Sequence, residues 1–512
     1  MTLLGNLRKR SMCSVSAAPA RGAVWAARFR IALPPATALL LLCAVLFVLT
    51  LHELGGYVTG NDPGNWLAAG RAMWESPADA NFARPLVPAL AQLLAFAVGP
   101  GDALCVLAVV SALCIPVALF LVLRTTTPLV LAAVAAFAVG ISRPVAEAVA
   151  FGGYPQQIAI AGTVLATWLT ARMLADPPVR AGWLTAALAL VALAHHVFYV
   201  LALVACALVV AFRLLEADRD AVLARAQELV MPVAVSLLAF APTAATMTYR
   251  GYEPTPGIAS MGLEADLAYT FGDARAFYAA ALIFGASGAA VLRLRGSVLQ
   301  AGAAMIVVAG AVFVVTSEQR LLAMLFVGAA LCAAHVAGEL VRTAPGPWVR
   351  GLVLAALGAG TLAFVPVALE TNADVFDYYR ILDDDLSATI DAVDHHPAPG
   401  TVAVAPGRDG WPIGWWFAGL GEREVVTGSN AGWLAFPGER DDAALVAAMT
   451  ADGVASGAAA ELAGAEGIGF LVADQGTWTG WREWLTEPSP AVELVFANER
   501  YVVLRFLGGV AE

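Results

Sequence analysis

Eleven apolar stretches, most of them long enough to cross a lipid bilayer, restrict what this chain can fold into. A membrane-spanning α-helix needs about 20 mainly apolar residues. Only 13% of the 512 residues are charged, which is too few to cover a soluble protein of this size. We therefore predict an α-helical polytopic membrane protein with about 11 transmembrane helices. The stretches lie at 32–51, 103–123, 127–142, 157–174, 181–195, 197–213, 228–246, 276–292, 297–315, 321–340 and 349–369.

Basic residues indicate the orientation of these helices, because cytoplasmic loops are enriched in arginine and lysine. With residues 1–31 as a cytoplasmic tail, the inner loops hold sixteen basic residues and the short outer loops hold six. This distribution requires that 84–99 does not span. We expect this segment to be an interfacial helix in a first outer loop over 52–102. The prediction is a multi-pass cell-membrane protein with an extracytoplasmic C-terminus.

The composition changes after the membrane domain over 32–369. Residues 370–512 contain seven of the thirteen tryptophans and alternate short apolar runs with polar segments. Such runs, bounded by glycine, proline or acidic turns, are typical of buried strands. We predict a small extracytoplasmic α/β domain. Its expected strands lie at 400–406, 423–428 and 467–474, its helices at 441–453 and 461–467, and its terminal hairpin at 491–497 and 500–506.

Polar residues gather at the predicted outer ends of the helices. Polar groups at membrane depth are costly, so their presence there indicates function by default. The first of them, Asp62, follows the first apolar stretch by about ten residues and opens a short amphipathic helix. The others that we select as candidates are Tyr154, Gln156, His195, His196, Arg250, Glu318 and Arg320.

Asp62 has two compatible interpretations. It precedes Pro63, and an aspartate before a proline at the first helical position is a common helix N-cap. It could also act as a general base on an acceptor hydroxyl or amine. A capping role would fix the position of the carboxylate for catalysis.

The two ionic residues after the ninth stretch also have two interpretations. Arg320 could be an interfacial arginine that reaches toward water or a partner for Glu318. It could instead bind a lipid phosphate, because the planar guanidinium matches phosphate oxygens.

The remaining candidates have structural alternatives as well. His195 and His196 could be metal ligands or proton carriers, or a pair packed at a helix end. Tyr154 and Gln156 belong to the segment GGYPQQ, which could contact substrate or be a helix-entry turn. The C-terminal tryptophans could stack on sugar rings or form part of a core.

The order of these features resembles the GT-C class of glycosyltransferases, and most closely the protein O-mannosyltransferases and the lipid A aminoarabinose transferases. The likeness rests on NDPGNWLAAGRAMWESPADANFARPLVPALAQLLAFAVGPGDALCVLAVVSALCIPVALFLVL. This segment has an acid that opens an amphipathic helix, then an RP…P helix, a Gly-Asp turn and a second span. The resemblance covers about 32–124 in detail and reaches 370 by topology. The family often has two adjacent acids, and Pro63 stands at the second position here.

The resemblance implies a glycosyltransferase in the lipid bilayer. It would transfer a sugar, with inversion, from a polyprenyl-phosphate donor to a glycan, lipid or protein acceptor at the outer face, and no nucleic-acid partner is expected. A divalent metal is compatible with the class, but one aspartate is too few ligands to predict one. In this assignment Asp62 is the base, Arg320 and Arg250 bind the donor phosphate, and Tyr154, Gln156, His195, His196 and Glu318 contact substrate.

Two non-enzymatic functions remain as alternatives. A transporter or flippase should show charged or broken helices near the bilayer midplane and internal symmetry, and we find no repeat. An envelope assembly protein with an extracytoplasmic binding domain would need the C-terminal domain but not the first-loop carboxylate. A cavity that contains both Asp62 and Arg320 would favour the enzyme.

Overall fold

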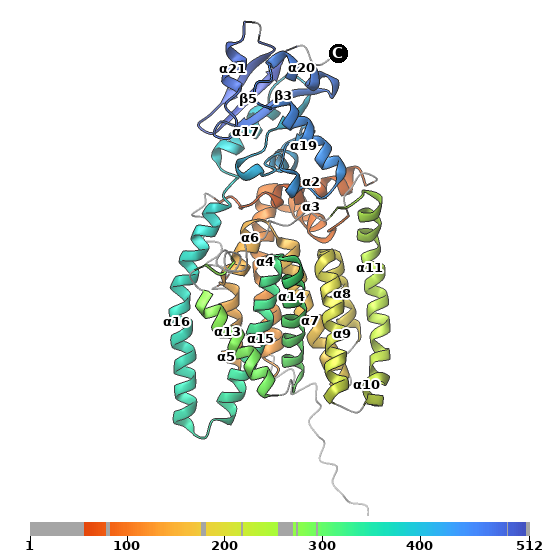
Figure 1. Ribbon diagram of the computed structural model, residues 1–512, viewed down its shortest axis with the longest axis vertical. Helices are drawn as coiled ribbons and strands as arrows, with labels where there is room; N and C mark the ends of the chain where they lie inside the picture. The colour runs from red at the N-terminus through yellow and green to blue at the C-terminus, as the bar shows by residue number, and fades with distance from the viewer. Residues whose placement is uncertain are drawn as a thin grey trace, which may run out of the picture.

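The protein consists of a helical bundle that carries a small α/β domain at one end (Figure 1). The predicted span at 32–51 lies outside the described residues, apart from Cys43. The helical membrane fold with a small C-terminal sheet confirms the fold class predicted from the sequence. The computed structural model describes residues 43, 56–77, 82–175, 181–216, 219–253, 270–272, 275–292, 295–488 and 490–507.

Within the described part of the chain, seven helices are long and apolar enough to cross a membrane, and a bent pair with a 45° angle could be an eighth. The long helices are α4 (Pro100–Leu123), α7 (Tyr154–Ala175), α9 (His196–Glu216), α10 with α11 (Arg219–Ala226 and Val230–Tyr249), α14 (Ser297–Thr316), α15 (Arg320–Thr343) and α16 (Pro347–Tyr378). The bent pair is α5 (Leu129–Gly140) with α6 (Arg143–Ala150). The predicted spans at 181–195 and 276–292 form the shorter helices α8 (Ala181–Ala194) and α13 (Arg275–Val291).

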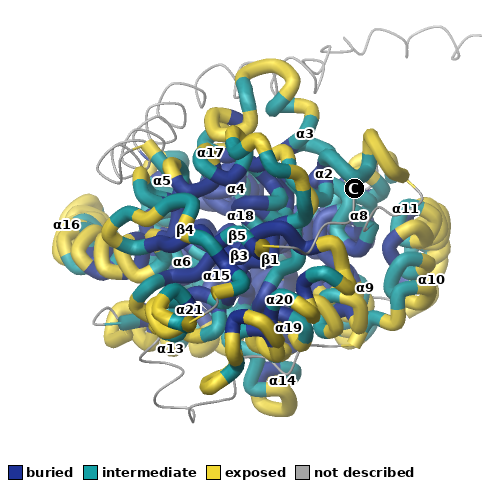
Figure 2. Tube along the Cα trace, turned by 90° about the horizontal axis from the view of Figure 1, so that it is seen from above, coloured by how far each residue is buried: buried dark blue, intermediate teal, exposed yellow. Residues whose placement is uncertain are grey.

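The centre of the bundle packs closely because small residues lie at helix crossings. A Cβ atom on Gly302 of α14 would lie 2.8 Å from the carbonyl oxygen of Gly328 in α15. Close backbone approach of this kind is the usual way in which helices associate in lipid. The helices at the rim, α16 and α11, are mostly exposed (Figure 2), and their exposed side chains are largely apolar. The rim therefore has the surface expected against lipid.

Two short helices lie across the end of the bundle, beneath the α/β domain (Figure 1). They are α2 (Asp62–Glu75) and α3 (Leu86–Val98). A helix of 13 residues, such as α3, is about 20 Å long, which is too short to cross a hydrocarbon core of about 30 Å. The bundle thus has a covered end, on which the α/β domain rests.

The α/β domain follows α16, which continues through residue 370 to Tyr378. Its five-stranded sheet has the order β2-β1-β3-β5-β4, with β2, β1 and β3 parallel and β3, β5 and β4 antiparallel. The strands are β1 (Thr401–Val404), β2 (Val425–Thr427), β3 (Ile468–Asp474), β4 (Val492–Ala497) and β5 (Tyr501–Phe506), each within a predicted run. The helical elements are α17 (Asp384–Asp394), η3 (Arg408–Gly410), α18 (Gly414–Leu420), η4 (Ala431–Trp433), α19 (Pro437–Met449), α20 (Ser456–Ala465) and α21 (Trp481–Thr486).

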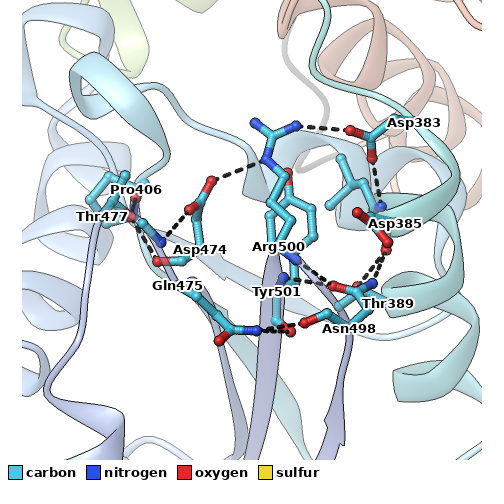
Figure 3. A network of polar contacts seen from close by, with 12 residues as sticks. Asp383, Asp385, Thr389, Pro406, Asp474, Gln475, Thr477, Asn498, Arg500 and Tyr501 are labelled. Carbon is cyan, nitrogen blue, oxygen red and sulfur yellow. Dashed lines mark hydrogen bonds and ion pairs between the residues drawn. The ribbon is translucent and has the colours of Figure 1, made fainter.

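A charged network joins α17 to the sheet (Figure 3). Arg500, which precedes β5, contacts Asp383 at 2.9 Å and Asp474 at 3.2 Å. Asp383 also caps α17 by accepting a hydrogen bond of 2.8 Å from the backbone N–H of Leu386. One guanidinium therefore fixes the start of α17 against the end of β3.

Candidate active site

A cavity of about 430 Å³ lies between the covered end of the bundle and the α/β domain. We call its bundle side, which includes Asp62, Arg84, Gln156, His196 and Arg320, the floor. We call its α/β-domain side the roof, which consists of lining residues between Trp411 and Glu439. The cavity thus joins segments that are far apart in the sequence.

The structure brings five of the eight candidate residues to this cavity. Asp62, Gln156, His196, Glu318 and Arg320 line it. The other three, Arg250, Tyr154 and His195, are absent from its lining. Arg250 follows the end of α11. Burial raises the pKa of the nearby cavity residue Glu439, and the charge of Arg250 partly opposes this rise. Tyr154 and His195 are buried, and His195 stacks on His196 with 5.1 Å between ring centroids.

Asp62 is the first residue of α2 and is not its N-cap, which corrects the capping interpretation. The N-cap is Asn61, and no side chain caps the helix. In the described part of the chain, the Asp62 carboxylate has no hydrogen bond or ion pair, so it is free to meet a ligand. Burial raises its pKa, and the charges of Arg84 and Arg320 partly oppose this rise.

The position of Asp62 depends on close contact with a glycine turn. The indole Nε1 of Trp66 donates a hydrogen bond of 2.8 Å to the carbonyl oxygen of Gly152. Gly152 has φ +91°, and a Cβ atom there would lie 2.3 Å from Cδ of Pro63 and 2.8 Å from Cβ of Asp62. Only glycine fits such a conformation and contact without strain. The GGYPQQ segment therefore supports Asp62 through its backbone.

The α/β domain holds the same helix from the other side. Trp416 in α18 donates a hydrogen bond of 2.9 Å from its indole to the carbonyl oxygen of Gly60. A Cβ atom on Gly64 would lie 2.6 Å from the carbonyl oxygen of Trp415, so α2 and α18 touch along their backbones. Arg71 donates hydrogen bonds to the carbonyl oxygens at both Gly419 and Gly421. The C-terminal domain is thus part of the structure that positions Asp62.

Two arginines lie near the carboxylate. Arg320 begins α15, and its Nε lies 3.2 Å from Glu318, so it has the predicted ionic partner and also faces the cavity. Arg84 was not selected from the sequence, although an arginine directly before an apolar helix was a usable signal. Its guanidinium lies 5.8 Å from the ring centroid of Trp66. Burial lowers the pKa of Arg84, and the charge of Arg320 lowers it further.

The described residues do not form a metal centre. No group of three or more His, Cys, Asp or Glu side chains in this part of the chain could hold an ion. His196 has a different partner, because its Nε2 lies 3.2 Å from the hydroxyl of Tyr252. The histidine pair therefore packs against the end of α11.

The aromatic residues of the roof differ in how they are packed. Trp411 is only 3% exposed, because Tyr379 stacks on it at 5.8 Å and the guanidinium of Arg408 lies 4.6 Å from its ring centroid. Trp415 and Trp433 also line the cavity but are more accessible. The sequence indicated the tryptophans as a group but not which of them meet the cavity.

No protein-family model and no curated protein sequence matches the chain. Its structure is similar to that of ArnT from Cupriavidus metallidurans bound to undecaprenyl phosphate, with a TM-score of 0.57 at 13% identity over 93% of this chain and 98% of that chain. The apo state of that protein gives a TM-score of 0.58 at 13% identity over 95% and 98%. The arabinofuranosyltransferase AftD from mycobacteria gives 0.56 at 17% identity over 92% of this chain and 40% of AftD. This chain therefore has the fold of these solved structures, which is the GT-C fold that the resemblance in its sequence predicted.

Proposed function

We propose that this protein is a membrane glycosyltransferase that uses a polyprenyl-phosphate sugar donor and Asp62 as general base. The observation that carries the proposal is the shared cavity of Asp62, Arg84 and Arg320. Such a cavity combines a carboxylate that can take a proton with cations that can stabilise a phosphate. This combination is what transfer from a phosphate leaving group requires.

The proposed reaction is a single displacement at the anomeric carbon of the donor. The acceptor oxygen or nitrogen forms a bond to this carbon while the bond from the carbon to the phosphate oxygen breaks. The electron pair of the broken bond leaves with the phosphate, and the acceptor proton passes to the carboxylate of Asp62. The products are the inverted glycoside and the polyprenyl phosphate. The raised pKa of Asp62 strengthens it as a base.

Arg84 and Arg320 are the proposed donor-phosphate residues. Negative charge grows on the phosphate as the bond breaks, and two guanidinium groups in a partly enclosed cavity stabilise it. Arg250 lies outside the cavity lining. We therefore assign to Arg84 the donor-phosphate role that the sequence analysis gave to Arg250. The solved ArnT complex with undecaprenyl phosphate supports a lipid of this type as the carrier.

The cavity is proposed to face the outer side of the membrane. The distribution of arginine and lysine over the loops supports this orientation. The α/β domain covers the same end of the bundle as α2 and α3, so the acceptor would arrive from the aqueous side (Figure 1). The donor lipid would approach from the bilayer.

Transfer of a labelled sugar from a polyprenyl-phosphate donor by the purified full-length protein tests the proposal. Replacement of Asp62 by Asn should reduce transfer at least about 100-fold, because it removes the base. Asp102→Asn is a matched control, since Asp102 also lies in the first turn of a helix but is exposed outside the cavity. Equal transfer by wild type and Asp62→Asn would remove Asp62 from the mechanism, and no transfer with any donor would reject the enzyme.

A further inference from the structure

We infer that the acceptor is a carbohydrate chain, which binds against the indole rings of Trp415 and Trp433 in the roof. This inference rests on the proposed function and names its acceptor class. It begins from the four tryptophans that line the cavity. These are Trp66, Trp411, Trp415 and Trp433.

Two of the four indole rings already contact other side chains or the backbone of the protein. Trp66 bonds to Gly152 and lies beside the guanidinium of Arg84. Trp411 is enclosed by its aromatic and arginine neighbours. Trp415 and Trp433 differ, because neither has an aromatic or cation–π contact with any described residue. Trp433 is also 37% exposed, so its ring is available to a ligand.

The local structure fixes the backbone at both tryptophans, and the ring of Trp433, before a ligand arrives. Trp433 ends η4, whose N-cap Asn430 accepts a hydrogen bond of 3.0 Å from the backbone N–H of Gly432. Its indole donates a hydrogen bond of 3.4 Å to the carbonyl oxygen of Asp409. Trp415 directly precedes Trp416, whose indole donates a hydrogen bond to the carbonyl oxygen of Gly60, so the backbone at Trp415 is fixed. A ligand therefore meets an ordered ring at Trp433 and a fixed backbone at Trp415, which lowers the ordering free energy that opposes its binding.

The cavity offers both kinds of group that a sugar needs, which are aromatic surface and hydrogen-bonding side chains. The apolar C–H face of a sugar ring can pack on an indole, and its hydroxyls need hydrogen-bonding partners. The amides of Asn61, Asn65 and Gln156 line the same space. The Oδ1 atom of Asn61 is buried and has no hydrogen-bond partner among the described residues. A hydroxyl of the acceptor would satisfy this atom next to the catalytic carboxylate.

The charge distribution separates this subsite from the donor phosphate. Both arginines that line the cavity in the described structure belong to the floor. The roof carboxylate, Glu439, accepts hydrogen bonds from the backbone N–H groups of Ala435 and Phe436. The roof thus presents aromatic surface and no unpaired cation, which favours a sugar ring over a phosphorylated group. A carbohydrate on Trp415 and Trp433 would direct its hydroxyl from the roof toward the floor, where the donor is bound.

Binding of a glycan to the full-length protein in lipid nanodiscs tests this inference without any transfer. The protein is applied to arrays of short oligosaccharides and of serine- and threonine-containing peptides, and the best-bound oligosaccharide is then titrated by calorimetry. Trp433→Ala and Trp415→Ala should each weaken its affinity about tenfold. Trp433→Leu keeps apolar volume without an aromatic ring and should show the same loss if folding is intact. Trp481→Ala is the control, because Trp481 lies in α21 outside the cavity.

Retention of oligosaccharides with the expected loss in the variants would support the inference. Retention of peptides alone, retention of neither array, or unchanged affinity in the two cavity variants would overturn it. Release of labelled sugar from the polyprenyl-phosphate donor to water is measured in parallel. Donor turnover without glycan binding would reject the acceptor class and leave the enzyme, whereas glycan binding without turnover of any donor would reject the enzyme.

Discussion

Trp66 and Gly152 are joined by a buried hydrogen bond of 2.8 Å from the indole nitrogen to the carbonyl oxygen. This bond links α2 to the turn that leads into α7. It holds the Gly152 backbone directly against Asp62 and Pro63, which begin α2. The proposed base is therefore placed by backbone contact, and its position depends on the absence of a side chain at Gly152.

Replacement of Gly152 by Ala should damage both stability and transfer. The new Cβ would collide with Asp62 and Pro63 in a left-handed conformation, which should cost about 2 kcal/mol and displace the carboxylate. We expect sugar transfer to fall more than tenfold. Thermal unfolding and a transfer assay measure the two effects. Gly101→Ala is the control, since a Cβ there meets nothing within 4 Å, and an equally small effect at Gly152 would contradict the contact.

The transfer rate should depend on pH through Asp62. The base acts when it is deprotonated, so the rate should fall as the pH drops through its pKa. Because burial raises this pKa, the loss should begin above the ordinary carboxyl value of about 3.9. Arg84 lowers the same pKa, so Arg84→Ala should move the acid limb to higher pH. If the acid limb of the rate–pH profile is not shifted in Arg84→Ala, the charge of Arg84 does not control the pKa of the catalytic base.

Undecaprenyl phosphate should bind through Arg84 and Arg320. Removing either guanidinium by substitution with Ala should weaken binding of this lipid about 10- to 100-fold, because each makes a charge-assisted contact. Arg84→Lys should restore part of the affinity, since lysine keeps the charge without the planar fork. Calorimetric titration in detergent measures the effect. Arg350 is an exposed arginine in the first turn of α16 and serves as the control. Arg350→Ala should bind undecaprenyl phosphate as the wild type does, and an equal loss of affinity in this variant would indicate non-specific electrostatic binding.

The architecture was largely predictable because its signals are local. Apolar length identified the helices, and short apolar runs bounded by turns identified all five strands. The count of spans was less predictable. The segments at 181–195 and 276–292 form helices of 14 and 17 residues, shorter than a typical span. Apolar composition does not specify where a helix ends within a packed bundle.

The site was only partly predictable because its contacts join distant segments. Asp62 and Arg320 had local signals at helix ends, and the cavity contains both. The sequence marked Gly152 only as part of a possible helix-entry turn and did not distinguish Trp416 from the other tryptophans, because their contacts with the start of α2 join segments far apart in the sequence. The helix boundary also moved by one residue, which placed Asn61 at the N-cap. Sequence can indicate a polar residue at a helix end but not the backbone packed against it.

Arg500 should stabilise the α/β domain more than an exposed ion pair does. Arg500→Gln removes the cation between Asp383 and Asp474, whose side chains are only 20% and 10% exposed. We expect a loss of about 2 kcal/mol, below that of a fully buried pair because the arginine is partly in water. Glu493→Gln breaks a pair that is about 40% exposed and should cost under about 1 kcal/mol. Tryptophan fluorescence during thermal unfolding compares them, and equal shifts would show that the network contributes no more than a surface pair.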